Sequence, residues 1–175
     1  NTAYSGGGIR SKESNLSMNN VMINNNNAIY SGGGIQVDFD YGIDNPPYIV
    51  TLEDVIIDNN ISEDYAGGIK INTNNPNSIV SLLNVQISHN ISDEGGGILF
   101  EGWQGEVILN NVIINGNIAN SKGGGMYFGW NSSANVSLMK ILLIENYSIG
   151  HGGGIFLLAS ANINLQNSTI AANMV

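Results

Sequence analysis

Apolar and polar positions recur along this chain in a fixed phrase. The copy at residues 50–60 ends in Asn60, and its apolar positions are Val50, Leu52, Val55 and Ile57. Alternation of apolar and polar residues with a period of two predicts β-strands. The alternation changes phase once in the middle of each copy, which predicts a bend between two strands. The phase changes fall at Asn20, Asp54, Asn84, Asn111, Lys140 and Asn167.

A second phrase, in which glycines precede Ile or Met, lies between the copies of the first. It occurs six times, at residues 6–9, 32–35, 67–69, 95–98, 123–126 and 152–155. The Asn residues that close the first phrase are spaced by 34, 30, 27, 29 and 27 residues, so both phrases belong to one repeating unit. A unit of this length with short strands and no helical pattern is typical of a β-solenoid. The sequence therefore predicts an all-β fold, a right-handed parallel β-helix of about six coils with three strands per coil.

The repeat predicts two kinds of residue column along such a solenoid. Ile35, Ile69 and Ile98 belong to an inward column that follows the glycines, and Leu52 and Leu82 belong to another. The Asn residues that close the phrase fall in register at a bend, where side-chain amides can hydrogen-bond to the next coil and satisfy buried backbone groups. They are Asn60, Asn90, Asn117, Asn146 and Asn173. We therefore expect a dry apolar core beside a ladder of amides.

The repeats cover residues 1–175, which we interpret as a single β-helix segment. Neither end shows a capping helix or a charged or Pro-blocked strand, and an uncapped β-helix exposes sheet edges. We therefore expect the segment to be part of a longer solenoid array, or else a unit that stacks end to end.

The combination of Gly-Gly-x-Ile with aliphatic-x-x-Asn resembles the repeats of the chlamydial polymorphic outer-membrane proteins. Those repeats have Gly-Gly-Ala-Ile and Phe-x-x-Asn, and Ile or Leu replaces the Phe here. The chain is equally similar to right-handed β-helix regions, including those of the pectin-lyase type, in large surface proteins of bacteria and some protists. The resemblance covers nearly the whole chain. It implies an adhesin, passenger or surface-fibre role outside the cell or on its surface, with no catalytic motif.

Charge and composition narrow the function classes. The chain has 14 acidic and 5 basic residues, a net charge of -9 and no Cys. Nucleic-acid binding needs clustered Lys and Arg, so this balance argues against it. No apolar run approaches the roughly 20 residues that span a bilayer, so we expect no membrane insertion by this segment. The lack of Cys removes disulfides, thiolate catalysis and Cys-ligated metal sites.

One outward column is more apolar than a solvated surface requires. It follows the bend of the first phrase and consists of Met22, Ile56, Gln86, Ile113, Leu142 and Thr169. Contiguous apolar stripes mark contacts. Two interpretations remain open, in which either a flanking segment of this chain covers the column or another chain packs against it laterally. The predicted interaction surface is Met22, Ile56, Ile113 and Leu142.

The long loop at residues 36–48 carries the candidate chemistry. Asp38 and Asp40 supply paired carboxylates for a glycoside hydrolase, which is the enzymatic alternative. Asp38, Asp40 and Asp44 alternate around Gly42 as in half of a calcium loop, so calcium is the candidate cofactor. The terminal bidentate Glu of such a loop is missing.

Loop aromatic residues are candidates for stacking on sugar rings. They are Tyr41, Tyr48, Trp103 and Trp130. Among the Asn-x-Ser/Thr sequences, Asn131 and Asn135 lie in a predicted loop and are the candidate glycosylation sites, whereas the ladder Asn residues should be unmodified. Glu94 and Lys122 precede the glycines of consecutive coils, so we expect an ion pair between them.

These observations predict a non-catalytic extracellular or cell-surface β-solenoid. Its expected role is a structural spacer and interaction surface, through adhesion or through lateral or end-to-end assembly. The expected partners are other protein chains or like subunits, with surface carbohydrate as a further candidate. The alternatives are a glycoside hydrolase and a calcium-stabilised carbohydrate-binding module.

Overall fold

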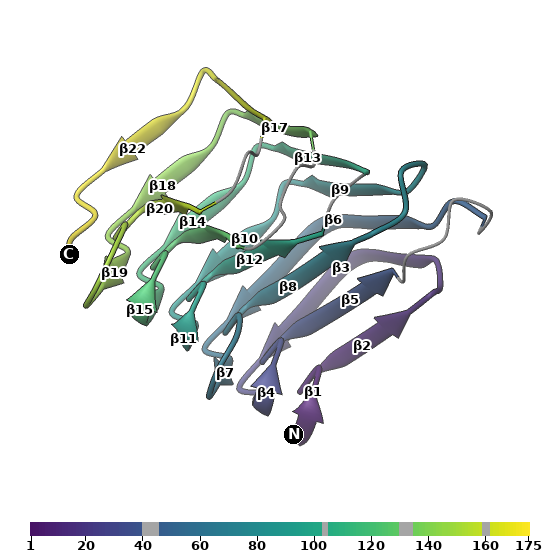
Figure 1. Ribbon diagram of the computed structural model, residues 1–175, viewed down its shortest axis with the longest axis horizontal. Coiled ribbons are helices and arrows are strands. Elements are labelled where there is room, and N and C mark those ends of the chain that lie inside the picture. The colour runs from purple at the N-terminus through teal and green to yellow at the C-terminus, as the bar shows by residue number, and fades with distance from the viewer. Residues whose placement is uncertain (40–45, 103–104, 130–134, 159–161) are drawn as a thin grey trace.

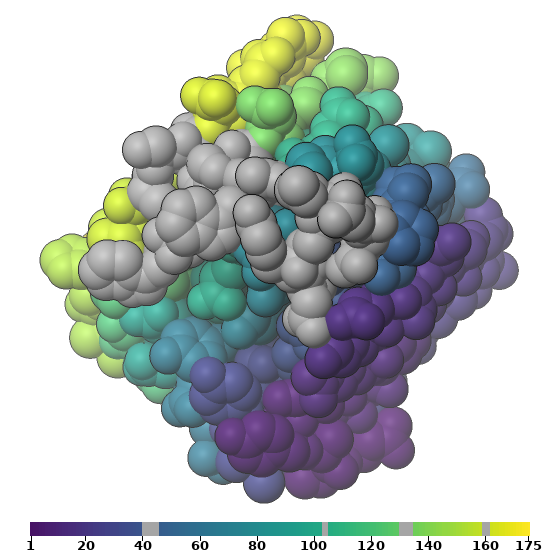
Figure 2. All heavy atoms as spheres, turned by 45° about the vertical axis from the view of Figure 1, so that its right-hand side comes forward, coloured from purple at the N-terminus to yellow at the C-terminus, as the bar shows by residue number. Residues whose placement is uncertain are grey.

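The computed structural model describes residues 1–39, 46–102, 105–129, 135–158 and 162–175, which form strands and turns without a helix. The chain is a parallel β-solenoid of about five turns, which confirms the predicted fold class and agrees with the predicted six or so coils to within about one turn. Figure 1 shows the coils stacked from the purple N-terminal end to the yellow C-terminal end, and Figure 2 shows them as successive bands on the surface. None of the described segments is a helix with the length and apolarity needed to cross a bilayer.

Three parallel sheets run along the solenoid. Sheet A consists of β1 (Thr2–Ser5), β4 (Asn27–Ser31), β7 (Ile61–Ser62), β11 (Ile91–Glu94), β15 (Ile118–Lys122) and β19 (Tyr147–Ser148). Sheet B consists of β2 (Ile9–Lys12), β5 (Ile35–Phe39), β8 (Ile69–Thr73), β12 (Ile98–Glu101), β16 (Met126–Phe128) and β20 (Ile155–Leu157). Each strand of sheet B begins at the Ile or Met that follows the glycines, where the glycine phrase predicts a strand.

Sheet C contains both strands of the first phrase and bends where they meet. The long strands β3 (Leu16–Asn24) and β6 (Ile49–Asp58) run through the bend. The part of β6 before the bend pairs with β9 (Ile79–Leu83), and the sheet then continues through β13 (Glu106–Asn110), β17 (Asn135–Met139) and β21 (Asn162–Gln166). The part of β6 after the bend pairs with β10 (Gln86–Ser88), and the sheet then continues through β14 (Ile113–Asn115), β18 (Leu142–Ile144) and β22 (Thr169–Ala171).

The predicted bend is confirmed, and its cause is a left-handed residue in every coil. Asp54 has a φ of 53° in β6, and Lys140 has a φ of 54° three coils later. The same conformation occurs at Asn20, Asn84, Asn111 and Asn167. Asn and Asp tolerate this region because their short polar side chains bond locally. One left-handed residue shifts the alternation, so Val55 and Ile57 point inward while Ile56 points outward.

Sheet A is a further strand in each coil, between the closing Asn and the glycines, which the sequence pattern did not indicate. Its strands are as short as the two residues of β7. Its inward side chains are small and buried, including Ser62, Ser92 and Ala119. A short strand with Ser and Ala on its inner face produces no apolar alternation, so the period-two signal is absent there.

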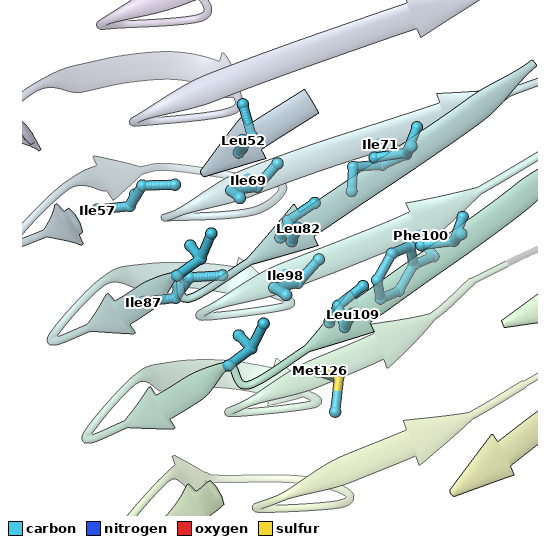
Figure 3. Close-up of a cluster of buried hydrophobic side chains, with 14 of the residues drawn as sticks. Leu52, Ile57, Ile69, Ile71, Leu82, Ile87, Ile98, Phe100, Leu109 and Met126 are labelled. Carbon is cyan, nitrogen blue, oxygen red and sulfur yellow. The ribbon is translucent and has the colours of Figure 1, made fainter. Parts of the chain in front are cut away.

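The apolar core is a set of columns that run along the solenoid axis. Ile69, Ile98 and Met126 lie one above another from sheet B, in register across β8, β12 and β16. Leu82 and Leu109 do the same from sheet C, and Figure 3 shows both columns meeting in the interior. The core cluster is continuous from Met18 to Leu143. Burial of aliphatic side chains between coils stabilises each coil only while its neighbours are in place.

The predicted ladder of amides is also confirmed. Asn60, Asn90, Asn117 and Asn146 are fully buried. Each donates its side-chain amide to the side-chain oxygen of the next, over 2.9–3.0 Å, as far as Asn173. The same oxygen accepts the backbone N–H of the preceding ladder residue, so one side chain satisfies groups on two coils.

Candidate interaction surface

The column predicted as an interaction surface exists as one continuous row of side chains on the outside of sheet C. Met22 pairs in register with Ile56, Ile56 with Gln86, and Gln86 with Ile113. The register continues from Ile113 to Leu142 and from Leu142 to Thr169. We call this row of six residues the apolar column. Met22 is 61% exposed and Ile113 is 39% exposed, so among the described residues the column is not covered.

A row of polar residues, the corner column, runs beside the apolar column. It consists of the left-handed residues Asn20, Asp54, Asn84, Asn111, Lys140 and Asn167. The side-chain amide of Asn84 donates to Asp54 Oδ1 over 3.0 Å, and the amide of Asn111 donates to Asn84 Oδ1 over 2.8 Å. These bonds tie Asn84 and Asn111 each to the corner residue of the coil before it.

A shallow groove of about 320 Å³ lies between the two columns. Asp54, Asn84 and Asn111 line one side of it, and Ile56, Gln86 and Ile113 line the other. One wall offers carboxylate and amide groups and the other is mainly aliphatic. This arrangement can receive a side chain that has both an apolar stem and a polar end.

Asp58 marks the far border of the apolar column, at the end of β6. Its Oδ1 lies 2.9 Å from His89 Nδ1 and accepts a hydrogen bond from Ser88 Oγ over 2.9 Å. Partial burial raises the pKa of Asp58, but the hydrogen bonds from His89 and Ser88 outweigh it and hold the pKa below its ordinary value. Ser88 donates to the carboxylate rather than to His89, so these three residues lack the Ser–His bond that activates a nucleophile.

The acidic loop is represented among the described residues by Asp38 alone. Its carboxylate forms an ion pair with Arg10 over 3.2 Å and accepts two hydrogen bonds from the Gln36 side chain. Asp38 is 8% exposed, and its oxygens are therefore occupied by protein donors. Asp40 and Asp44 lie outside the described residues. Within the described ranges, no three His, Asp or Glu side chains gather closely enough to hold a metal ion.

Tyr48 is the one aromatic sugar-contact candidate among the described residues. Its ring stacks on the buried Phe39 ring, with the centroids 5.1 Å apart, and it packs against the core. Tyr41, Trp103 and Trp130 lie outside the described residues. Of the two glycosylation candidates, Asn135 is exposed at the start of β17, and Asn131 lies outside the described residues.

Charged residues also pair on sheet A, at the ends of β11 and β15, and charged and aromatic residues gather on the outer face of sheet B. The predicted pair is confirmed, since Lys122 Nζ lies 2.6 Å from Glu94 Oε1. Lys70 forms a second ion pair with Glu101 over 2.9 Å and lies 5.1 Å from the centre of the Tyr65 ring. Sequence reasoning missed this second pair. The spacing alone did not give this pair, because Lys70 is in register with Leu99 and Glu101 lies two residues further along β12.

Sheet A carries a second exposed apolar row that sequence reasoning missed. Ile61 pairs in register with Ile91, Ile91 with Ile118, and Ile118 with Tyr147. These residues follow the ladder Asn directly, so the spacing identified them once a strand was placed there. This row lies on a different face from the apolar column and provides a matched control for experiments on it.

Comparison with known proteins gives no match to a family model, to a curated protein or to a solved structure. The parallel β-solenoid is therefore established from the chain's own repeat and register.

Proposed function

We propose that this chain is a non-catalytic β-solenoid that acts as a stiff spacer and as an interaction surface outside the cell. The observation that carries the proposal is the apolar column, which stays in register across the six coils and is exposed at Met22 and Ile113. Exposed contiguous apolar rows on soluble domains mark contacts with other molecules. Lateral packing against another chain is the contact that a straight row of this kind supports best.

The spacer role is supported by how the coils are joined. Parallel backbone hydrogen bonds, the buried amide ladder and the core columns all run along the axis. Each coil contacts its neighbours over its whole outline, so bending requires several of these contacts to open together. The fold therefore favours a rod of fixed length over a flexible linker.

The location outside the cell and the kinship with surface proteins rest on the resemblance of the repeats to β-helix regions of bacterial and protist surface proteins. Labelling of intact source cells with an antibody to this chain tests the location. Signal only after permeabilisation overturns it.

Variants of the apolar column test the interaction surface. Ile56→Ser with Ile113→Ser should reduce association of the chain with its own copies or with source-cell surfaces, measured by sedimentation and by a binding assay on whole cells. Ile61→Ser with Ile91→Ser on sheet A is the matched control, because it removes the same side chains from another face. Equal behaviour of wild type and the sheet C variant in both assays overturns the proposal.

The non-catalytic part has its own test. Incubation with plant, bacterial and host polysaccharides should release no new reducing ends, and Asp38→Asn should leave every readout unchanged. Release of reducing ends that Asp38→Asn abolishes would establish the glycoside hydrolase instead.

A further inference from the structure

Two opposite charges stand at equivalent steps from the middle of the corner column. Asp54 is second and Lys140 is fifth in the row of six, and Asn84 and Asn111 are the two middle residues. The coil spacing of about 4.8 Å places Asp54 and Lys140 roughly 14 Å apart along the axis. They are too far apart to pair within one chain. When the corner column is placed opposite a copy of itself in reverse order, however, each Asp54 faces a Lys140.

Both charged groups are available to a partner. Lys140 is exposed and forms no ion pair with another described residue. Asp54 is exposed, and among the described residues its carboxylate accepts a single side-chain hydrogen bond, from the neutral amide of Asn84. The neighbouring acid, Glu53, accepts a hydrogen bond from Asn19 over 2.9 Å. Among the described residues, Arg10–Asp38 and Lys70–Glu101 lie on sheet B and Glu94–Lys122 lies on sheet A, while Asp58 and His89 contact each other at the far border of the apolar column; none of these pairs includes Asp54 or Lys140.

A second copy of the chain can meet this face in two symmetric ways. A two-fold axis along the solenoid pairs the coils in parallel and brings like charges level with each other. A two-fold axis across sheet C, level with the midpoint between Asn84 and Asn111, reverses the coil order and returns each column to itself. This antiparallel arrangement places Asp54 opposite Lys140 of the other copy, twice per dimer. Self-complementarity of this kind is what a two-fold interface requires.

In the same antiparallel arrangement, the apolar column of one copy lies opposite the apolar column of the other. Ile56 lies opposite Leu142 of the second copy, and Gln86 lies opposite its Ile113. The groove lies beside Ile56, Gln86 and Ile113, near the centre of the pairing. Ile113 of the second copy, whose side chain is exposed, therefore meets the hollow beside Gln86.

We propose that the apolar column is the interface of an antiparallel two-fold pairing with a second copy of this chain, in which Asp54 of each copy contacts Lys140 of the other. The proposal rests on the interaction surface proposed above and names its partner and orientation. The face is narrow for a protein interface, so the pairing is expected in the micromolar to millimolar range.

Charge reversal tests the contact. Asp54→Lys or Lys140→Asp alone should weaken self-association by at least about tenfold, because each converts both attractive contacts into repulsive ones. The double variant Asp54→Lys with Lys140→Asp should restore it. A mixture of the two single variants should also associate, since the lysines of one then face the aspartates of the other. Sedimentation equilibrium measures all four cases.

The substitutions are compatible with the fold. Lys140 already holds the left-handed conformation that a lysine at position 54 needs, with φ values of 54° and 53°. Thermal unfolding of each variant checks this directly. A charge reversal beside sheet A, Glu63→Lys at the exposed residue after β7, is the control and should leave self-association within about twofold of wild type.

Cysteine cross-linking tests the orientation, and the chain contains no Cys of its own. A mixture of Ile56→Cys and Leu142→Cys chains should form the mixed disulfide under mild oxidation. Ile56→Cys alone should form little, because its two copies lie roughly 14 Å apart along the axis in the antiparallel pairing. Predominant Ile56→Cys homodimers overturn the antiparallel orientation.

The outcomes separate the two proposals. Self-association that ignores the charge reversals overturns this inference, while loss of association in the Ile56→Ser with Ile113→Ser variant still supports the interaction surface. A chain that stays monomeric at millimolar concentration overturns this inference too. Cell-surface binding that the apolar column variants abolish would then keep the proposed function.

Discussion

The side-chain amide of Asn90 donates to Oδ1 of Asn117 over 3.0 Å, and the same oxygen accepts the backbone N–H of Asn90 over 3.0 Å. Asn90 also donates to the backbone oxygen of Ile57, one residue before the end of β6. The Asn90 side chain therefore satisfies buried groups on both neighbouring coils, at Ile57 and Asn60 on one side and at Asn117 on the other. This explains why the repeat ends in Asn rather than in Ser or Thr, since the Asn90 amide donates two hydrogen bonds and accepts two, whereas a hydroxyl has a single donor.

Replacement of a ladder residue should be costly. Asn90→Ala leaves the backbone N–H of Asn60 and the side-chain amide of Asn60 without their acceptor in a dry site. We expect a loss of about 3 kcal/mol in the free energy of unfolding, from chemical denaturation. Asn120→Ala, at an exposed position, is the control and should cost less than about 0.5 kcal/mol. Similar stability of the two variants would contradict the ladder's role.

The glycines of the second phrase are required by close approach of neighbouring coils. A Cβ on Gly96 would lie 2.5 Å from the backbone oxygen of Gly124 and 2.6 Å from that of Ile118. Gly96→Ala should therefore lower the free energy of unfolding by about 3 kcal/mol, because the backbone at Gly124 and Ile118 of the next coil must move to make room for the added Cβ. The control is Gly129→Ala, where the nearest atoms to a Cβ are side-chain carbons 3.5 Å away. Thermal unfolding of both variants measures the difference, which should exceed about 2 kcal/mol.

Asp93 should make stability depend on pH. Burial, followed by the nearby charges of Glu94 and Asp64, raises the pKa of Asp93 above its ordinary 3.8, against a smaller opposing effect of Lys122. The folded state therefore holds this proton to higher pH than the unfolded state, and stability falls as pH rises from about 3.8 through the raised pKa. Asp93→Asn should raise the unfolding temperature at pH 7 and have no effect near pH 3.

Glu145→Gln is the control for Asp93→Asn, because it removes the same charge from an exposed corner. Thermal unfolding as a function of pH compares the two variants. A gain at pH 7 from Glu145→Gln as large as that from Asp93→Asn would attribute the effect to net charge alone.

The Tyr127 hydroxyl should contribute nothing to stability. It is buried, with 1% of the residue exposed, and has no hydrogen-bond partner among the described residues. Burial and the charges of Glu94 and Glu101 raise the pKa of Tyr127 to about 12. Tyr127→Phe should leave the free energy of unfolding unchanged or raise it by up to about 1 kcal/mol. In an alkaline titration followed by ultraviolet absorbance, the variant should lack the tyrosine that ionises near pH 12. A loss of stability in Tyr127→Phe would contradict this account.

Much of the fold could be predicted because each coil repeats the same local rules. The period-two alternation predicted sheet C, the glycine phrase predicted sheet B, and the shift in phase predicted the bend at Asp54. The spacing of Asn60, Asn90 and Asn117 identified the amide ladder. The strands of sheet A were not predicted, because their inward residues are Ser and Ala, which produce no apolar alternation.

The apolar column was predictable as a row but not as a surface. Its members follow from counting two residues beyond each bend, as Ile56 follows Asp54. Whether they are covered depends on what folds over them, which no local pattern records. The match of Asp54 with Lys140 in reverse order likewise becomes visible only when the coils are stacked in register.

The amino-acid sequence by itself determined that this chain winds into stacked parallel strands, since the alternation, the Asn at each bend and the glycine phrase are patterns that every repeat carries in its own residues. Tertiary structure alone decided which outward rows stay exposed, how Asp38 is neutralised by Arg10, and which charges face a common side. The reason is distance: these relationships join residues of different coils, and their energies depend on burial and spacing that exist only once the coils are packed.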